Sequence, residues 1–113
     1  MIKKKFKPAF DGLVKGFRHP SVRLQFLLGL MAVIAGIVLK LSRSEWVIVI
    51  FAIAMVIASE LFNTCIEQLC DLYTTEQNEA IGRIKDISAA AVLVSSIAAL
   101  IAAIIILIQH LEG

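Results

Sequence analysis

The sequence has few charged residues for its length. Only 18% of its 113 residues are charged, whereas 59% are hydrophobic. The mean hydropathy of +0.89 lies outside the usual range of soluble domains. The net charge of +2 is too small to indicate a nucleic-acid partner. The composition therefore excludes an ordinary soluble domain and predicts a membrane protein.

The common local motifs of nucleotide and metal binding are also missing. There is no Walker A loop, no G-x-G-x-x-G and no protein-kinase signature, so any nucleotide site would have to be built from helix side chains. No Cys/His pattern of a zinc site is present. Cys65 and Cys70 lie five residues apart on one predicted helix and point in different directions, so we expect them not to pair.

Long apolar runs dominate the remainder of the chain. A membrane-spanning helix needs roughly 20 mostly apolar residues. The run from Trp46 to Ala58 is short, and its helix must continue through Glu60 to cross the membrane. We predict an all-α membrane protein with a single membrane domain over residues 1–113. Its expected parts are an interfacial amphipathic helix at 1–19 and transmembrane helices at about 21–41, 46–72 and 86–109.

The expected interfacial helix has one apolar face and one charged face. Apolar residues recur at helical spacing, and polar residues take the other side: Phe6, Phe10, Leu13, Val14 and Phe17 against Lys7, Asp11, Lys15 and Arg18. The pattern predicts a helix lying on the membrane surface and held to anionic lipid by its lysines. We expect Pro8 in its first turn, an end at His19-Pro20, and Ser21 as the cap of the next helix.

Basic residues are concentrated before the first apolar run. Seven of the eleven lysines and arginines precede it: Lys3, Lys4, Lys5, Lys7, Lys15, Arg18 and Arg23. By the positive-inside rule this end is cytoplasmic, and three crossings place the 67–86 connection on the same side. Small residues also recur every three or four positions in the first and third runs, at Gly29, Ala32 and Gly36 and at Ala91, Ser95, Ala99 and Ala103. Such rows let helices pack closely, within one chain or between subunits.

One face of the second long helix carries the polar residues that could perform chemistry. With Glu60 at zero, Asn63, Glu67 and Asp71 fall at about −60°, −20° and +20° around the helix. Glu60 lies about 21 Å along the helix from Trp46, inside the hydrocarbon boundary, and Glu67 lies near that boundary. A row of acids repels itself unless a cation neutralises it, and an oxygen-rich site favours Mg²⁺. Glu60 is the candidate general base.

A second polar motif precedes the third apolar run. It reads Gly82-Arg83-Ile84-Lys85-Asp86, and its cations are candidates for contacts with phosphate. Together with the E-x-x-N-x-x-x-E-x-x-x-D pattern from Glu60 to Asp71, it resembles the small prokaryotic diacylglycerol kinase and undecaprenol kinase family. The likeness covers nearly the whole chain, including Arg23 and the Leu-Ser-Arg-Ser-Glu-Trp segment at 41–46.

This resemblance implies a homotrimeric enzyme of the bacterial plasma membrane that transfers the γ-phosphoryl group of MgATP to a membrane lipid hydroxyl. It makes Glu60 the catalytic base and Glu67 a metal ligand. The residues implied in nucleotide binding are Asn63, Glu67, Asp71, Lys85 and Asp86. Undecaprenol is slightly preferred over diacylglycerol as the acceptor, because the 41–46 segment looks more like that of the undecaprenol kinases.

The sequence departs from the family pattern at one candidate metal ligand. His19 stands where the family usually has a glutamate, and no acid occurs between Asp11 and Glu45. His19 could still bind the metal. Two alternatives therefore remain open beside the lipid kinase: a non-catalytic relative that binds nucleotide or metal, and an ion or proton carrier. The third run contains nothing more polar than serine and shows no continuous relay, which disfavours the carrier.

Overall fold

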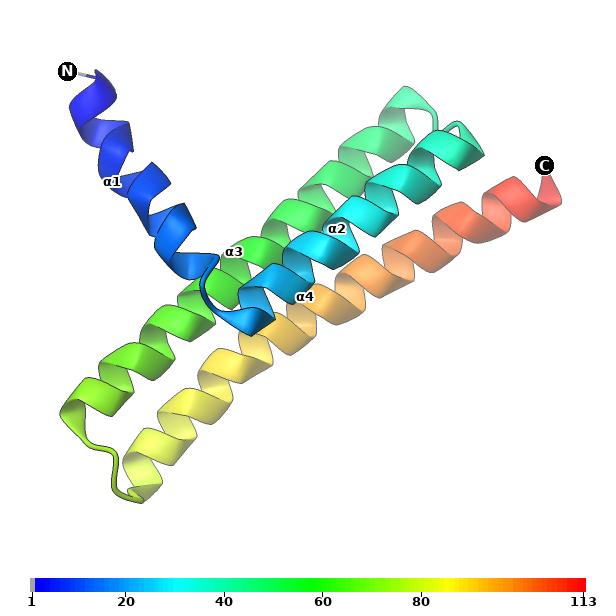
Figure 1. Cartoon of the computed structure of the whole chain (residues 1–113). Coiled ribbons are helices and arrows are strands. Elements are labelled where there is room, and N and C mark those ends of the chain that lie inside the picture. The colour runs from blue at the N-terminus through cyan, green and yellow to red at the C-terminus, as the bar shows by residue number, and fades with distance from the viewer. Residues whose placement is uncertain (1) are drawn as a thin grey trace.

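The protein is a bundle of three long helices with a shorter helix attached to its side (Figure 1). The computed structural model describes residues 2–113, with side chains from residue 4 onward, and no strand occurs in that part of the chain. The helices are α1 (Ile2–Gly16), α2 (Pro20–Leu39), α3 (Arg43–Tyr73) and α4 (Glu79–Glu112). The all-α membrane fold, with a first amphipathic helix and three apolar helices, is confirmed.

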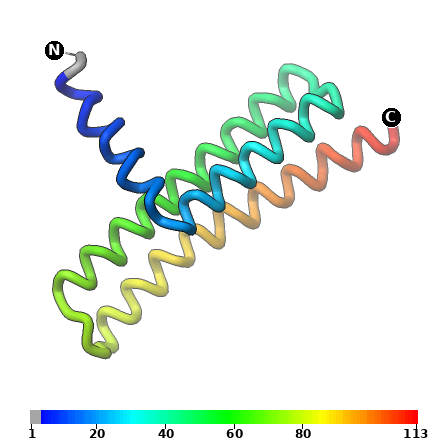
Figure 2. Tube along the Cα trace, viewed as in Figure 1, coloured from blue at the N-terminus to red at the C-terminus, as the bar shows by residue number. Residues whose placement is uncertain are grey.

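The three long helices differ in length. All three are long and apolar enough to cross a membrane. At 1.5 Å per residue, the 20 residues of α2 span about 30 Å, which matches the hydrocarbon thickness, whereas the 31 of α3 and 34 of α4 span about 46 and 51 Å. Figure 2 shows that the additional length of α3 and α4 lies at one end, where both helices continue past the start of α2 to their connection. This projecting end is where α4 begins, at Glu79, well before the apolar run that starts at Ile87.

α3 lies between its neighbours and packs against both α2 and α4. Two glycines of α2 allow it to approach closely. A Cβ atom at Gly29 would lie 2.9 Å from the Ile53 side chain, and one at Gly36 would lie 2.7 Å from the Trp46 ring. Two members of the small-residue row predicted on the first span therefore permit helix packing.

Most apolar side chains of the bundle face outward. In the most apolar stretch of α4 only 6% of the residues are buried, and in those of α2 and α3 only 17% are. An apolar cavity of about 490 Å³ lies among the three long helices, with Ala32, Ala99 and Ala103 in its lining. An exterior of this kind is stable in lipid or against other apolar helices, not in water.

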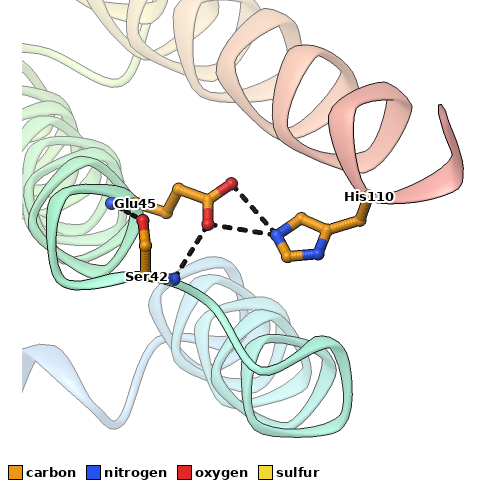
Figure 3. Close-up of polar contacts among 3 residues, drawn as sticks. All are labelled: Ser42, Glu45 and His110. Atoms are coloured by element: carbon orange, nitrogen blue, oxygen red, sulfur yellow. Dashed lines mark hydrogen bonds and ion pairs between the residues drawn. The ribbon is translucent and has the colours of Figure 1, made fainter. Parts of the chain in front are cut away.

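Polar contacts fix α3 and α4 at the end opposite the projecting one. Ser42 and Glu45 form a capping box: the Ser42 amide donates to Glu45 Oε1 at 2.8 Å, and the Glu45 amide donates to Ser42 Oγ at 3.3 Å. His110 of α4 lies with its Nε2 atom 3.0 Å from both oxygens of the same carboxylate (Figure 3). Glu45 therefore takes part in capping the start of α3 and also joins α3 to the last turn of α4.

The start of α2 and the position of Pro8 in α1 both differ from expectation. α2 begins at Pro20, with His19 in the N-cap position, so Ser21 lies within the helix and is not its cap. Proline at the first helical position lacks only an amide that would have no partner there, which favours this start. Pro8 lies inside α1 and not in its first turn, because the helix extends back through the lysines that precede it.

Candidate active site

The predicted polar face of α3 changes from buried to exposed along its length. Glu60 and Asn63 are 6% and 8% exposed, whereas Glu67 and Asp71 are exposed. Burying a carboxylate is costly unless a partner or a function compensates for it. The face therefore has an enclosed end at Glu60 and an open end at Asp71, with two helical turns between Glu60 and Glu67.

Asn63 connects the two ends. Its Nδ2 atom donates a hydrogen bond to Glu67 Oε1 at 3.3 Å. Its Oδ1 atom is buried and has no hydrogen-bond partner within the described residues. A buried acceptor left without a donor costs on the order of 1–3 kcal/mol, so such atoms cluster where a ligand or water completes the site.

Lys85 of α4 joins the open end of this face. Its ammonium group lies 2.7 Å from Asp71 Oδ1, and both side chains are partly exposed. The pair brings together the two sequence motifs, which come from different helices. Beside Lys85, a hollow of about 480 Å³ is lined by the α3–α4 connection and the first turns of α4, including Thr75, Asn78 and Gly82.

Asn78 shapes the start of α4 in this hollow. Its side-chain oxygen accepts hydrogen bonds from the amides of Ala80 and Ile81, at 2.9 and 3.2 Å, and so caps the helix. This cap fixes the start of α4, the helix that carries Lys85. The remaining predicted nucleotide-binding residue, Asp86, directly follows Lys85 on α4 and is exposed.

His19 lies at the α1–α2 boundary and contacts α3 one residue beyond Glu67. Its Nε2 atom is 2.9 Å from Nε2 of Gln68. The structure thus pairs this candidate metal ligand with an amide. The sequence did not indicate a role for Gln68, because a single glutamine on a helix forms no motif and its partner His19 is 49 residues away.

Ser88 is a second polar residue that sequence reasoning missed. It lies on α4, two residues after Asp86, and is only 7% exposed. Thr64, next to Asn63, is likewise buried. Both are small hydroxyl residues within otherwise apolar helices, where buried polar groups concentrate at functional or packing contacts.

The donor set suits a magnesium ion that is held mainly by phosphate. Within residues 2–113, no group of three or more His, Cys, Asp or Glu side chains is placed to hold a metal by itself. Mg²⁺ commonly binds one or two carboxylates together with substrate phosphates and water. Glu67, exposed and positioned by Asn63, is the carboxylate that would fit this role.

The chain is similar in sequence to proteins named diacylglycerol kinase and undecaprenol kinase. The diacylglycerol kinase of Escherichia coli strain K12 is 35% identical over 81 residues, which cover 72% of this chain and 66% of that protein. The diacylglycerol kinase of Shigella flexneri matches equally. The undecaprenol kinase of Bacillus subtilis strain 168 is 33% identical over 78 residues, which cover 69% of this chain and 63% of that protein.

These relatives carry two different names at nearly the same identity, and the matched part spans slightly less than two thirds of each. A broader match covers most of this chain, because residues 7–107 fit the family described as prokaryotic diacylglycerol kinase. That range contains the whole polar face of α3 and the Lys85–Asp71 pair. The chain therefore belongs to the prokaryotic diacylglycerol kinase family.

Proposed function

We propose that this protein is a lipid kinase that transfers the γ-phosphoryl group of MgATP to the hydroxyl of a membrane lipid. The observation that carries the proposal is the division of one helix face between a buried carboxylate and an exposed charged pair. Glu60 is 6% exposed, and the Lys85–Asp71 pair lies open on the projecting end. A lipid alcohol reaches the first position from the bilayer, and a soluble nucleotide reaches the second from water.

Glu60 acts as the general base in this scheme. Its carboxylate accepts the proton of the lipid hydroxyl while that oxygen forms a bond to the γ-phosphorus. The bond from the γ-phosphorus to the β,γ-bridging oxygen breaks, and ADP leaves. The products are a phosphorylated lipid and ADP, and the proton on Glu60 passes to water. Such reactions depend mainly on positioning and on neutralising charge.

The nucleotide is held by the open end of the face. Lys85 exchanges its contact with Asp71 for the phosphates, and Asn63 offers an N–H of its Nδ2 atom, which also donates to Glu67. Asp71 and Asp86 complete the polar surroundings. Glu67 is the magnesium ligand, with His19 as a second candidate. A magnesium ion held there would neutralise charge that develops on the phosphates.

Two further parts of the proposal concern the assembled protein. The N-terminus faces the cytoplasm of a bacterial cell, so that the projecting end meets cytoplasmic ATP; the excess of basic residues before α2 supports this orientation. The chain assembles as a homotrimer, with active sites between subunits. The outward-facing apolar surface of α4 and the row of small residues along it support an assembly, because such rows let helices of neighbouring subunits pack closely.

Undecaprenol is the acceptor we favour, on the basis of the segment at 41–46, and diacylglycerol is the second candidate. A non-catalytic relative is the alternative function. The His19–Gln68 contact favours it, because His19 replaces the usual acid and its Nε2 atom already contacts an amide.

Purified protein in mixed micelles, given radiolabelled ATP and Mg²⁺, tests the proposal directly. Undecaprenol and diacylglycerol are supplied separately, and lipid-soluble label is counted. We expect labelled undecaprenyl phosphate at a higher kcat/KM than labelled phosphatidic acid. Absence of both products, with nucleotide binding retained, would establish the non-catalytic alternative instead.

A further inference from the structure

The segment between α1 and α2 is held in one conformation by its own hydrogen bonds. The amides of Phe17, Arg18 and His19 donate to backbone carbonyls within the preceding turn, at 2.9–3.2 Å. Arg23 then folds back from α2: its Nη1 atom donates to the carbonyls of Phe17 and Arg18 at 3.4 and 3.2 Å. We call residues 16–19 the joint.

The joint meets α3 at two heights. At Gly16, a Cβ atom would lie 2.5 Å from a terminal methyl group of Leu61, so the joint approaches α3 closely here and any side chain would displace Leu61. At His19, the ring contacts Gln68 at 2.9 Å. Leu61 and Gln68 are seven residues apart, about 10 Å along the helix. They directly follow Glu60 and Glu67, so the joint spans the same two turns as the polar face.

α1 leaves the bundle at this joint and points away from it (Figure 1). Its apolar residues remain exposed, including Phe6, Phe10 and Val14. An amphipathic helix with lysines on its other face lies in the membrane interface. The level of α1 in the bilayer is therefore transmitted to α3 through the joint.

From this geometry we infer that His19 and Gln68 are positioning residues, which set the depth at which a lipid hydroxyl meets Glu60. The inference rests on the proposed lipid kinase function. The His19–Gln68 contact is a polar contact between the joint and α3. It lies beside Glu67, farther from Glu60 than the Leu61 contact does. Without it, α1 and α3 keep the Leu61 contact but can rotate about it, which changes the depth of Glu60 relative to α1.

The chemistry of the pair favours this role over metal binding. The Gln68 amide has both donor and acceptor atoms for the ring nitrogen, so this contact occupies Nε2 of His19. A metal ion at the same nitrogen would displace Gln68.

The kinetic experiment compares Gln68→Leu, His19→Gln and a control, Gln109→Leu, which makes the same change at the far end of α4. We expect Gln68→Leu to lower kcat/KM for the lipid roughly tenfold, with KM for ATP and the half-saturating Mg²⁺ concentration within twofold of wild type. His19→Gln keeps an amide partner for Gln68, so its kcat/KM for the lipid should fall less than that of Gln68→Leu. A raised Mg²⁺ requirement in His19→Gln, with lipid kinetics unchanged, would instead make His19 a metal ligand and overturn the inference.

A second measurement needs no turnover. A nitroxide at Leu13→Cys, in a Cys65→Ser, Cys70→Ala background, reports the depth and mobility of α1 in vesicles. Gln68→Leu should increase its mobility, and Gln109→Leu should not; equal mobility in all three proteins would overturn the inference. If the wild type lacks kinase activity, the proposed function fails while this readout still reports on the joint. Should Gln68→Leu not fold, Gln68→Ala replaces it.

Discussion

Glu60 and Glu67 show how one helix places two carboxylates in different surroundings. They are two turns apart on the same face of α3, yet Glu60 is 6% exposed and Glu67 is exposed. Between them, Asn63 donates to Glu67 and leaves its own oxygen buried without a partner among the described residues. Enclosure suits a base that must exclude water from a phosphoryl transfer, and exposure suits a ligand for a soluble metal–nucleotide complex.

Replacing Glu60 by glutamine separates catalysis from binding. The amide has nearly the same size and does not charge, so the fold should persist while the proton acceptor is lost. We expect kcat to fall by about 10²–10⁴-fold, with the affinity for a non-hydrolysable ATP analogue unchanged in calorimetry. Glu112→Gln, at the other end of the bundle, is the matched control and should behave as wild type. Full turnover in Glu60→Gln would show that Glu60 is not the general base.

Two glycines differ in the space that surrounds them in their helices. Gly36 of α2 faces the Trp46 ring, where a Cβ atom would come within 2.7 Å, and Leu41 lies 3.0 Å from the same point. Gly12 of α1 has no atom within 4 Å of a Cβ built on it. The first glycine is required by packing of α2 on α3, whereas the second is not required by any packing within the described structure.

Alanine at these two positions should therefore change stability in opposite directions. Gly36→Ala must displace two side chains, and we expect a net loss of about 1 kcal/mol in the free energy of unfolding. Gly12→Ala should raise helicity in α1, where the propensity difference favours alanine by up to about 1 kcal/mol. Circular dichroism during denaturant titration in micelles measures both. An unchanged midpoint for Gly36→Ala would show that Trp46 moves freely.

The molecule as a whole is asymmetric along the membrane normal. At one end, the Ser42–Glu45 capping box and His110 close the bundle where α2 also ends. At the other end, α3 and α4 extend beyond α2 and carry the Lys85–Asp71 pair and the adjoining hollow. The Lys85–Asp71 pair and the adjoining hollow lie at the projecting end, so the proposed activity requires that end to face cytoplasmic ATP.

Cysteine labelling in intact cells tests this orientation. In a Cys65→Ser, Cys70→Ala background, single cysteines replace Ser44, in the first turn of α3, and Gln77, in the α3–α4 connection. A membrane-impermeant maleimide should label Ser44→Cys in intact cells and Gln77→Cys only after the membrane is opened. The reverse pattern would place the projecting end outside and contradict the proposed use of cytoplasmic ATP.

Local properties of the chain were sufficient to predict its class and the polar face. Apolar runs of membrane length specify three helices, and the spacing of Glu60, Asn63, Glu67 and Asp71 specifies one face, because both depend only on the helical period and on hydrophobicity. Helix ends were less predictable: Ser21 was expected to cap α2, but the cap is His19, two residues earlier, because the fixed φ of Pro20 suits the first helical position.

The contacts that join these elements were decided by the tertiary structure alone. Lys85 meets Asp71 across 14 residues, His19 meets Gln68 across 49, and Glu45 meets His110 across 65. No local pattern encodes such pairs, because each depends on how the helices rotate and slide against one another. The sequence thus determined which residues share a face in the membrane, and helix packing decided which of them meet, since partner choice depends on the relative positions of whole helices.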